Sequence, residues 1–269
     1  MKKHGARLGQ HFLTAHWAAV ALATAAHITD DLVIEVGPGK GALTGELLKL
    51  SRRVIAIEKD SALIEKLHEK FPMEIADGAL KIIDGDIRNF SPKAREGQTS
   101  LGGLTFPGPY VVAANIPYYI TGEIIRQFLS STAQPRTMAI LIQKEVAQRI
   151  VATNKKESIL SLSVKAYGVP RIVAKVGKGN FSPPPSVDSA ILAIDDISKK
   201  FFSDIHEEDF FKVVHAGFAS KRKYLANNLT VVFEKEKVQA AFTQLNISEK
   251  VRAEDVPLEK WGALTRHLL

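Results

Sequence analysis

The sequence predicts an α/β fold in two parts: an open parallel sheet with helices on both faces, followed by a small all-helical domain. Short and almost continuously apolar runs alternate with helical patterns between residues 32 and 195. Such runs are typical of strands buried on both faces, as in parallel sheets with crossover helices. Strand signals end near residue 200, and helical periodicity then continues to Leu269. We therefore divide the chain into residues 1–198 and 199–269.

The individual elements follow from hydrophobic pattern and from turn residues. Strands are predicted at 32–36, 54–57, 80–83, 110–114, 138–142, 171–176 and 190–194, the last two as closing strands. Helices are predicted at 17–26, 42–50, 61–71, 122–130, 145–152 and 158–167. The first of these has no convincing cleavage site, which favours a helix over a signal peptide, and Ser61 is a candidate N-cap. The Gly-, Pro- and Ser-rich stretch 91–109 is interpreted as a long connection outside the core, with room for one short helix.

Composition narrows the classes of function. The chain has 269 residues with 45% hydrophobic residues, a net charge of +7 and a pI of about 9.4. Basic residues gather at Lys2, Lys3 and Arg7 and again at 221–223. This clustering favours a polyanionic partner such as nucleic acid over a merely basic protein. No apolar run is long enough to span a bilayer, so we expect no membrane partner.

The absence of cysteine excludes disulfides, thiolate catalysis and cysteine-ligated metals, and it fits a reducing compartment. The eight histidines form no His-Glu-x-x-His or similar set, so we predict no catalytic metal. No Gly-x-Ser-x-Gly hydrolase motif is present either.

A glycine loop follows the first predicted strand of the sheet and opens a helix. It has the sequence Glu35-Val-Gly37-Pro-Gly39-Lys-Gly41. Glycines there let the backbone turn tightly and approach a ligand closely. The loop matches a relaxed dinucleotide fingerprint, with Glu58 at the end of the next strand, so binding of NAD or FAD is a competing interpretation.

Acidic residues at strand ends favour S-adenosylmethionine instead, which carries an ammonium, a sulfonium, a ribose and an adenine but no pyrophosphate. Glu35 is suited to the cationic amino-acid moiety, Glu58 to the ribose hydroxyls and Asp86 to the adenine amine. Each carboxylate by itself is more simply a solvated strand-end residue. Gly37, Glu58, Asp86 and Asn115, however, all fall at predicted carboxyl ends, where ligands of open parallel sheets bind.

A second motif, Asn115-Ile-Pro117-Tyr118, ends the fourth predicted strand. The Asn115 oxygen and the Ile116 carbonyl can accept both hydrogens of an exocyclic amine, and Tyr118 can stack on the ring that carries it. The same tetrapeptide also makes ordinary turns. The preceding glycine loop and acidic strand ends favour the binding interpretation.

Six ordered motifs, covering nearly the whole chain, resemble those of the rRNA adenine N6-dimethyltransferase (KsgA) family. They are Leu8-Gly-Gln10-His11-Phe12-Leu13, Glu35-Val-Gly-Pro-Gly-Lys-Gly-Ala-Leu-Thr44, Asn115-Ile-Pro-Tyr118, Gln143-Lys-Glu-Val146, Phe181-Ser-Pro-Pro-Pro-Ser-Val-Asp-Ser189 and Phe218-Ala-Ser-Lys-Arg-Lys-Tyr-Leu-Ala-Asn-Asn-Leu229. His11 stands where the family usually has Asn, and Lys221 begins a triplet that is usually Arg-Arg-Lys.

The resemblance implies a Rossmann-like class I S-adenosylmethionine-dependent methyltransferase sheet, with residues 1–30 as a helical segment over the cofactor. The implied cofactor contacts are His11, Leu13, Gly37, Gly39, Glu58, Asp86 and Asn115. The implied catalytic residues are Asn115, Pro117, Tyr118 and Phe181, and the implied RNA-binding residues are Lys221, Arg222 and Lys223 on a helix of residues 199–269. Without the resemblance, Phe181 is more simply a hydrophobic plug before a proline-rich turn.

The implied activity is dimethylation of N6 on two adjacent adenines in the 3′-terminal hairpin of small-subunit (16S) rRNA during ribosome biogenesis. The implied partners are the small ribosomal subunit and its rRNA, and we expect a cytoplasmic monomer. Three alternatives remain at this point: a large-subunit rRNA methyltransferase of the macrolide-resistance type, an RNA-binding assembly factor without catalysis, and a nicotinamide oxidoreductase.

Overall fold

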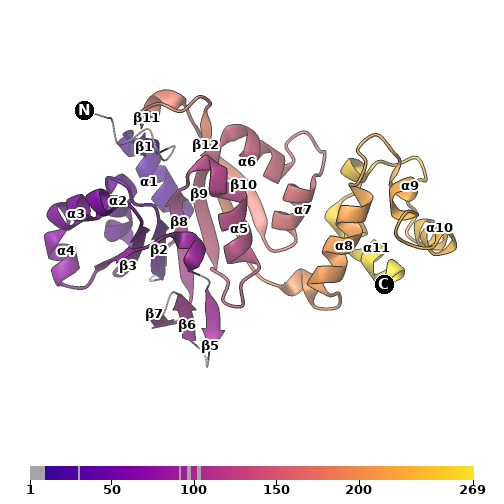
Figure 1. The fold of residues 1–269 in the computed structure, drawn as a ribbon, viewed down its shortest axis with the longest axis horizontal. Helices are drawn as coiled ribbons and strands as arrows, with labels where there is room; N and C mark the ends of the chain where they lie inside the picture. The colour runs from indigo at the N-terminus through magenta and orange to yellow at the C-terminus, as the bar shows by residue number, and fades with distance from the viewer. Residues whose placement is uncertain (1–9, 30, 91, 96–97, 102–103) are drawn as a thin grey trace. The chain divides into compact units, whose positions relative to one another are not determined.

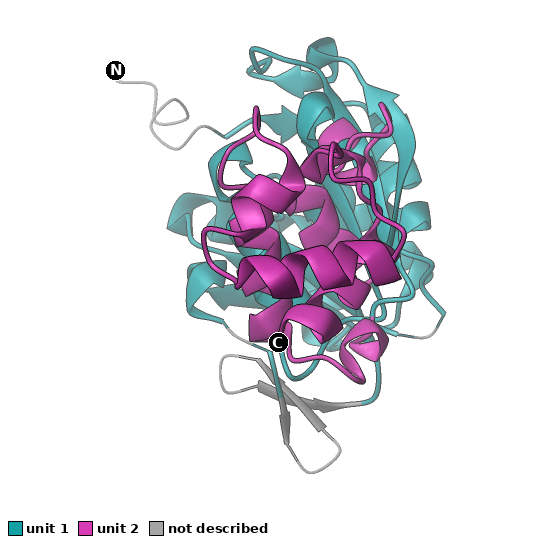
Figure 2. Cartoon of the chain, turned by 90° about the vertical axis from the view of Figure 1, so that its right-hand side faces the viewer, with its two compact units in different colours: residues 1–147, 169–197 teal, residues 148–168, 198–269 magenta. Residues whose placement is uncertain are grey.

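The computed structural model describes residues 10–29, 31–90, 92–95, 98–101 and 104–269. The chain forms two compact units, one of residues 1–147 and 169–197 and one of residues 148–168 and 198–269 (Figure 2). Segment 148–168, which the sequence analysis places in the first domain, thus groups with the C-terminal unit. Its backbone explains this: Glu157 N–H donates to Glu254 O at 2.7 Å, and Ser198 N–H donates to Tyr167 O at 2.8 Å.

The first unit is built on a seven-stranded sheet (Figure 1). Its strands, in spatial order, are β10 (Val169–Val176), β12 (Ser189–Asp195), β9 (Thr137–Gln143), β8 (Tyr110–Asn115), β2 (Leu32–Val36), β3 (Val54–Glu58) and β4 (Leu80–Asp84). The five strands from β9 to β4 are parallel, and β12 and β10 each run antiparallel to their neighbour. All seven predicted strands are confirmed, with small shifts at their ends.

Helices of the first unit pack on this sheet or connect its strands. They are α1 (His16–Ala25), α2 (Ala42–Leu50), α3 (Ser61–Lys70), α4 (Pro72–Ala76), η2 (Ile87–Asn89), η3 (Tyr118–Ile120), α5 (Thr121–Leu129) and η4 (Lys178–Asn180), and α6 (Lys144–Val151) crosses into the second unit. One detail corrects the sequence analysis. Asp60, not Ser61, caps α3, because Asp60 is still extended and its carboxylate accepts from Ala62 N–H at 3.0 Å.

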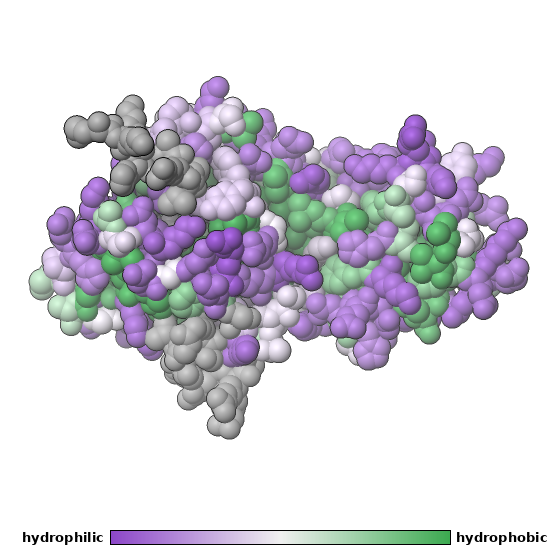
Figure 3. All heavy atoms as spheres, in the orientation of Figure 1, coloured by the Kyte–Doolittle hydropathy of each residue, from purple (hydrophilic) through white to green (hydrophobic). Residues whose placement is uncertain are grey.

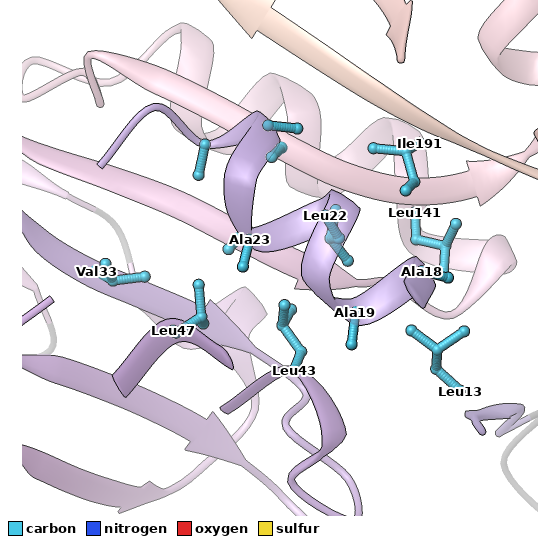
Figure 4. Close-up of a cluster of buried hydrophobic side chains, with 14 of the residues drawn as sticks. Leu13, Ala18, Ala19, Leu22, Ala23, Val33, Leu43, Leu47, Leu141 and Ile191 are labelled. Atoms are coloured by element: carbon cyan, nitrogen blue, oxygen red, sulfur yellow. The ribbon is translucent and has the colours of Figure 1, made fainter. Parts of the chain in front are cut away.

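Both faces of the sheet are buried, as the apolar runs predict. Val33 and Val111 belong to the core cluster that holds α1 and α2, whereas the next residues along each strand, Ile34 and Val112, are equally buried. Successive strand residues point to opposite faces, so both faces must be covered. Figure 4 shows the small residues of α1 lying among side chains of α2 and the sheet. The described part of segment 1–30 therefore includes a core helix.

Two small sheets complete the first unit. Within 91–109, the structure has strands β5 (Lys93–Arg95), β6 (Gln98–Leu101) and β7 (Leu104–Pro107) instead of a short helix, and they form a separate antiparallel sheet. Threonine in β6 and β7 and phenylalanine in β7 favour extended backbone, whereas the Gly and Pro content of the stretch predicted a connection. The other small sheet pairs β1 (Phe12–Leu13) with β11 (Phe181–Ser182).

The second unit is helical, as predicted. Its elements are α7 (Ile159–Lys165), η5 (Lys200–Phe202), α8 (Glu207–Gly217), α9 (Leu225–Leu229), α10 (Lys235–Gln244), η6 (Ala253–Asp255) and α11 (Leu258–Leu268). Trp261 is fully buried at its centre and donates from Nε1 to Val256 O at 3.1 Å. Gly217 makes room for this ring, because a Cβ there would lie 2.4 Å from it.

Hydrophilic residues cover most of the face that Figure 3 shows, with smaller hydrophobic groups between them. Within the ranges that the structure describes, no helix combines the length and the apolar character needed to cross a bilayer.

Candidate active site

A cavity that is partly open to solvent lies in the first unit at the carboxyl ends of the parallel strands. The glycine loop after β2, the residues that end β3 and β8, and the turn after β4 all contribute to its wall. The predicted residues found together in the lining are His11, Leu13, Glu35, Gly37, Gly39, Glu58, Asp86, Asn115, Pro117 and Tyr118. This is the convergence that the strand-end pattern predicts.

The glycine loop is held against the neighbouring strand. Gly39 N–H donates to Glu58 Oε2 at 3.1 Å, which fixes the loop over the end of β3. Gly39 has a φ of +58°, and a Cβ there would lie 3.1 Å from the Phe12 ring. Only glycine therefore allows both this turn and the approach of Phe12. The Lys40 ammonium lies over the same Phe12 ring, 4.7 Å from its centroid, in a cation–π contact.

Glu35 is a buried carboxyl group that lies close to Thr44. It is 1% exposed, and neither oxygen has a hydrogen-bond partner among the described residues. Burial raises the pKa of Glu35 to about 8, because its effect outweighs the opposing one of the nearby Thr44, and the Glu58 carboxylate adds a smaller increase. An uncompensated group of this kind is costly by itself. A cation in the pocket would compensate it, as the sequence analysis expects for the amino-acid moiety of S-adenosylmethionine.

Glu58 and Asp86 are already oriented by hydrogen bonds. Glu58 Oε1 accepts from the backbone N–H groups of Lys59 at 2.9 Å and Asp60 at 3.1 Å. Asp86 accepts from Arg88 Nε at 2.9 Å and Nη2 at 2.6 Å, and this guanidinium holds the pKa of Asp86 far below its usual range. Asp86 is therefore ionised at any physiological pH. An ionised carboxylate oxygen has lone pairs left for a hydroxyl or an amine.

Asn115 ends β8 with its side-chain amide fixed. Its Nδ2 donates to the backbone carbonyl of His11 at 3.1 Å, and since a carbonyl only accepts, this bond sets the orientation of the amide. Among the described residues, no donor reaches the Asn115 Oδ1. The side chain thus keeps an acceptor for a ligand in the cavity that it lines.

His11 and Tyr118 form a stacked pair beside Asn115. Their ring centroids are 5.9 Å apart with an interplanar angle of 30°. His11 Nδ1 donates to Pro183 O at 2.9 Å, and the Tyr118 hydroxyl shares a 2.7 Å hydrogen bond with Ser189. Burial raises the pKa of the Tyr118 hydroxyl, which therefore stays protonated. These contacts hold both rings in place before any ligand binds.

Comparison with known proteins agrees with this geometry. The family model for ribosomal RNA adenine dimethylases matches residues 1–268. The chain belongs to this family. A ribosomal RNA small subunit methyltransferase A of Dehalococcoides mccartyi is 41% identical over 260 residues, which cover 96% of this chain and 86% of that relative. The family and the S-adenosylmethionine-dependent enzyme class implied by the motifs are thereby confirmed.

Solved structures show the same fold. A dimethyladenosine transferase from Plasmodium falciparum has a TM-score of 0.76 at 25% identity, over 94% of this chain and 96% of that one. The 23S rRNA methyltransferase ErmE has a TM-score of 0.77 at 24% identity, over 96% and 99% of the two chains. The Rossmann-like class I methyltransferase fold is therefore confirmed.

Phe181 does not join the other predicted residues of this dimethylase in the cavity. It is 5% exposed, lies in the hydrophobic core cluster and pairs with Leu13 in the β1–β11 ladder. Its burial corresponds to the hydrophobic plug that the sequence alone favours. Phe181 lies opposite Leu13 in the ladder, and both side chains belong to the core cluster.

The basic triplet Lys221, Arg222 and Lys223 lies in a turn between α8 and α9, so its predicted placement on a helix is wrong. Buried Asn228 explains the turn, because its Nδ2 donates to Gly217 O at 2.6 Å and to Ser220 O at 3.0 Å. All three basic side chains are exposed. Lys2, Lys3, Arg7 and the first two residues of the N-terminal motif lie outside the described residues.

Four further residues belong to the site and were not predicted from the sequence: Lys59 and Tyr119 in the lining, Arg88 on Asp86, and Ser189 on Tyr118. Each follows or ends a motif that was recognised, and this proximity was the available signal. The glycine loop, the unpaired Glu35, the two oriented carboxylates and the Asn115 oxygen suit S-adenosylmethionine. In the described ranges, no three His, Asp or Glu side chains gather as a metal site would require.

Proposed function

We propose that this protein uses S-adenosylmethionine to dimethylate N6 of two adjacent adenines in the 3′-terminal hairpin of 16S rRNA during assembly of the small ribosomal subunit. The observation that carries this proposal is Asn115, whose amide nitrogen is held by His11 O while its oxygen keeps a free acceptor in the cavity. Relatives named as small-subunit methyltransferases support the choice of subunit. We place the activity in the cytoplasm and expect a monomer.

The cofactor, when bound, supplies a methyl group already activated on a sulfonium. Glu35 would balance the charge of its amino-acid moiety, Glu58 would accept from the ribose hydroxyls and Asp86 from the adenine amine. Because Glu58 and Asp86 are oriented by existing hydrogen bonds, little side-chain entropy is lost when they bind.

The remaining problem is the adenine amine, whose lone pair is delocalised into the ring. The Asn115 oxygen and the Ile116 carbonyl would accept its two hydrogens, which favours a pyramidal nitrogen aimed at the methyl group. Most of the rate then comes from positioning and local electrostatics, and no strong general base is needed because the proton becomes acidic only as the bond forms. Tyr118 would stack on the target base, and Phe181 would support the Leu13 strand from the core.

The test is transfer of labelled methyl from S-adenosylmethionine to small ribosomal subunits that lack the modification, with large subunits in parallel. The modified base is identified after nuclease digestion. We expect N6,N6-dimethyladenosine in small-subunit rRNA alone. Label only in large subunits would assign the protein to the large-subunit type. Cofactor binding without any label would favour an assembly factor that has lost catalysis.

A further inference from the structure

Two adjacent tyrosines at the cavity have opposite environments. Tyr118 and Tyr119 are consecutive residues of η3, and a 3₁₀ helix turns through about 120° per residue, so they must face different directions. Tyr118 is half-buried and held by His11 and Ser189. Tyr119 also lines the cavity, yet it is 60% exposed. It thus lies at the mouth of the cavity, with its ring open to solvent.

The Tyr119 ring is 60% exposed, and Arg88 lies close enough to interact with it electrostatically. No hydrogen bond and no ring contact joins it to any other described residue. The remaining residues of η3 and the start of α5 do the packing here, since Ile120 is 8% and Thr121 4% exposed. A tyrosine in this position is therefore not required by the core, and its apolar surface is available to a ligand.

Charges around Tyr119 are mutually compensated. Lys59 Nζ lies 3.7 Å and Arg88 Nη2 2.6 Å from Asp86 Oδ2. Glu123 and Tyr119 also lie close enough to Arg88 to interact with it electrostatically. Two cations thus face two carboxylates. A nucleic acid that reaches this mouth would find little net positive charge, so an aromatic face is the main source of affinity there.

We propose that Tyr119 is the stacking platform for the nucleotide next to the adenine being methylated. This inference rests on the proposed function, because an adenine that enters the cavity to reach Asn115 brings its neighbour to the mouth. Single-stranded bases are commonly held by aromatic side chains, and every base offers a π-face. In the proposed substrate that neighbour is the second target adenine, so Tyr119 would hold one adenine while the other is in the cavity.

The experiment compares Tyr119→Ala, Tyr119→Leu and Tyr119→Phe with wild type, using small subunits that lack the modification. We expect Tyr119→Ala and Tyr119→Leu to lower kcat/KM for the subunit by roughly 5- to 150-fold, the range for stacking one base on an aromatic ring. Tyr119→Phe keeps the ring and should stay within about twofold of wild type. The dissociation constant of S-adenosylmethionine and the melting temperature should be unchanged in all three.

A second arm tests the contact itself. Subunits are reconstituted with 16S rRNA in which the adenine beside the target is abasic. On this substrate, the kcat/KM of wild type should fall by the same factor by which Tyr119→Ala lowers it on normal subunits. The kcat/KM of Tyr119→Ala should fall little further on the abasic substrate, because the mutation and the abasic site remove the same interaction. The salt dependence of subunit binding should be the same for wild type and Tyr119→Ala, since stacking releases no counterions.

The outcomes separate the two proposals. If wild type does not dimethylate small subunits, the proposed function fails and the Tyr119 proposal falls with it. If wild type is active and Tyr119→Ala matches it, the function stands and the stacking role is overturned. Weaker cofactor binding in Tyr119→Ala would instead assign the ring to the methyl donor. Equal losses in Tyr119→Phe and Tyr119→Ala would show that the hydroxyl, not the ring, matters.

Discussion

The cavity of the first unit and the basic turn of the second are organised in opposite ways. Around the cavity, Glu58, Asp86 and Asn115 are each fixed by hydrogen bonds to neighbouring residues. In the turn 221–223, the three basic side chains are exposed, and none has an ion pair within the described residues. One region is ordered before its ligand arrives, and the other is left free in solvent.

The difference reflects the two kinds of interaction that recognition of an rRNA needs. Chemistry at one adenine amine depends on short-range geometry, and a shift of about 1 Å can cost two orders of magnitude in rate. Attraction of a polyanion acts over a Debye length of about 10 Å and tolerates mobile side chains. Changes in the cavity should therefore affect rates, whereas changes in the turn should affect affinity and its salt dependence.

The largest effect is expected for Asn115→Ala. Removing the Oδ1 acceptor should lower kcat by about 10²- to 10³-fold, the range seen when one positioned polar group is removed from a catalytic site. The rate should be measured at saturating S-adenosylmethionine, so that a lower affinity for the cofactor does not contribute. Loss of the bond to His11 O should cost only about 1 kcal/mol in stability, to be checked by denaturant unfolding. A near wild-type rate would show that Asn115 does not position the amine.

Charge reversal in the turn 221–223 should have the next largest effect. Changing Lys221, Arg222 and Lys223 to Glu should weaken binding to small subunits by tens of fold at 0.1 M salt, because phosphate contacts become repulsive. The slope of log K against log salt should fall by roughly 0.7 to 0.9 per lost contact. Cofactor affinity should not change.

The matched control for the turn is a single pair of variants, Arg222→Glu and Lys66→Glu. Both remove one exposed cation and add one anion, but Lys66 lies on α3 of the first unit. Both variants change the net charge equally, so Arg222→Glu should weaken binding to small subunits more than Lys66→Glu does. Equal effects of the two variants would mean that the turn is an ordinary solvated surface.

Glu35→Gln should alter stability, and leave the salt dependence of binding to small subunits unchanged. The pKa of Glu35 is about 8 in the folded protein, against an ordinary value of 4.5. Between these values the folded state keeps a proton that the unfolded state has lost, so the free energy of unfolding falls as pH rises, by at most about 1.4 kcal/mol per pH unit. Glu35→Gln should remove this slope.

Denaturant unfolding of wild type and Glu35→Gln between pH 5 and pH 8 measures the difference in slope, which does not depend on how well glutamine packs. Parallel slopes for the two proteins would contradict a protonated Glu35. Addition of S-adenosylmethionine should make the wild-type slope less negative, because a bound cation favours the carboxylate and lowers its pKa.

The smallest effect concerns the bond between Tyr118 and Ser189. Tyr118→Phe and Ser189→Ala should each lower the methyl-transfer rate severalfold, since each removes a hydrogen bond worth about 1 kcal/mol that orients the Tyr118 ring. The double variant should be no worse than the more affected single one. Additive losses would mean that the two groups act independently.

Much of the fold was predictable because it depends on local patterns. The runs at 32–36 and 110–114 are continuous and apolar, which is typical of buried parallel strands, and both are confirmed. The helix at 42–50 has the predicted bounds. The sheet within 91–109 was missed, because its strands are short, lie outside the main sheet and have many turn residues around them.

The sequence by itself determined which groups reach the carboxyl edge of the sheet, since the hydrophobic pattern and the glycine loop mark where each parallel strand ends. It could not determine which way those groups point. Phe181 lies in the core cluster, where β11 pairs with β1 from a distant part of the chain. The orientation of the Asn115 amide is fixed by the bond from its Nδ2 to the His11 carbonyl, which lies just before β1 and reaches the end of β8.

Tertiary structure likewise decided that Glu35 is unpaired, that Tyr119 faces solvent and that residues 221–223 form a turn held by Asn228. The environments of Glu35 and Tyr119 depend on which face of an element is covered, and the turn depends on the side-chain bonds from buried Asn228 to Gly217 and Ser220. Local propensity carries no information about such contacts. They arise only when burial of the two cores brings those segments together.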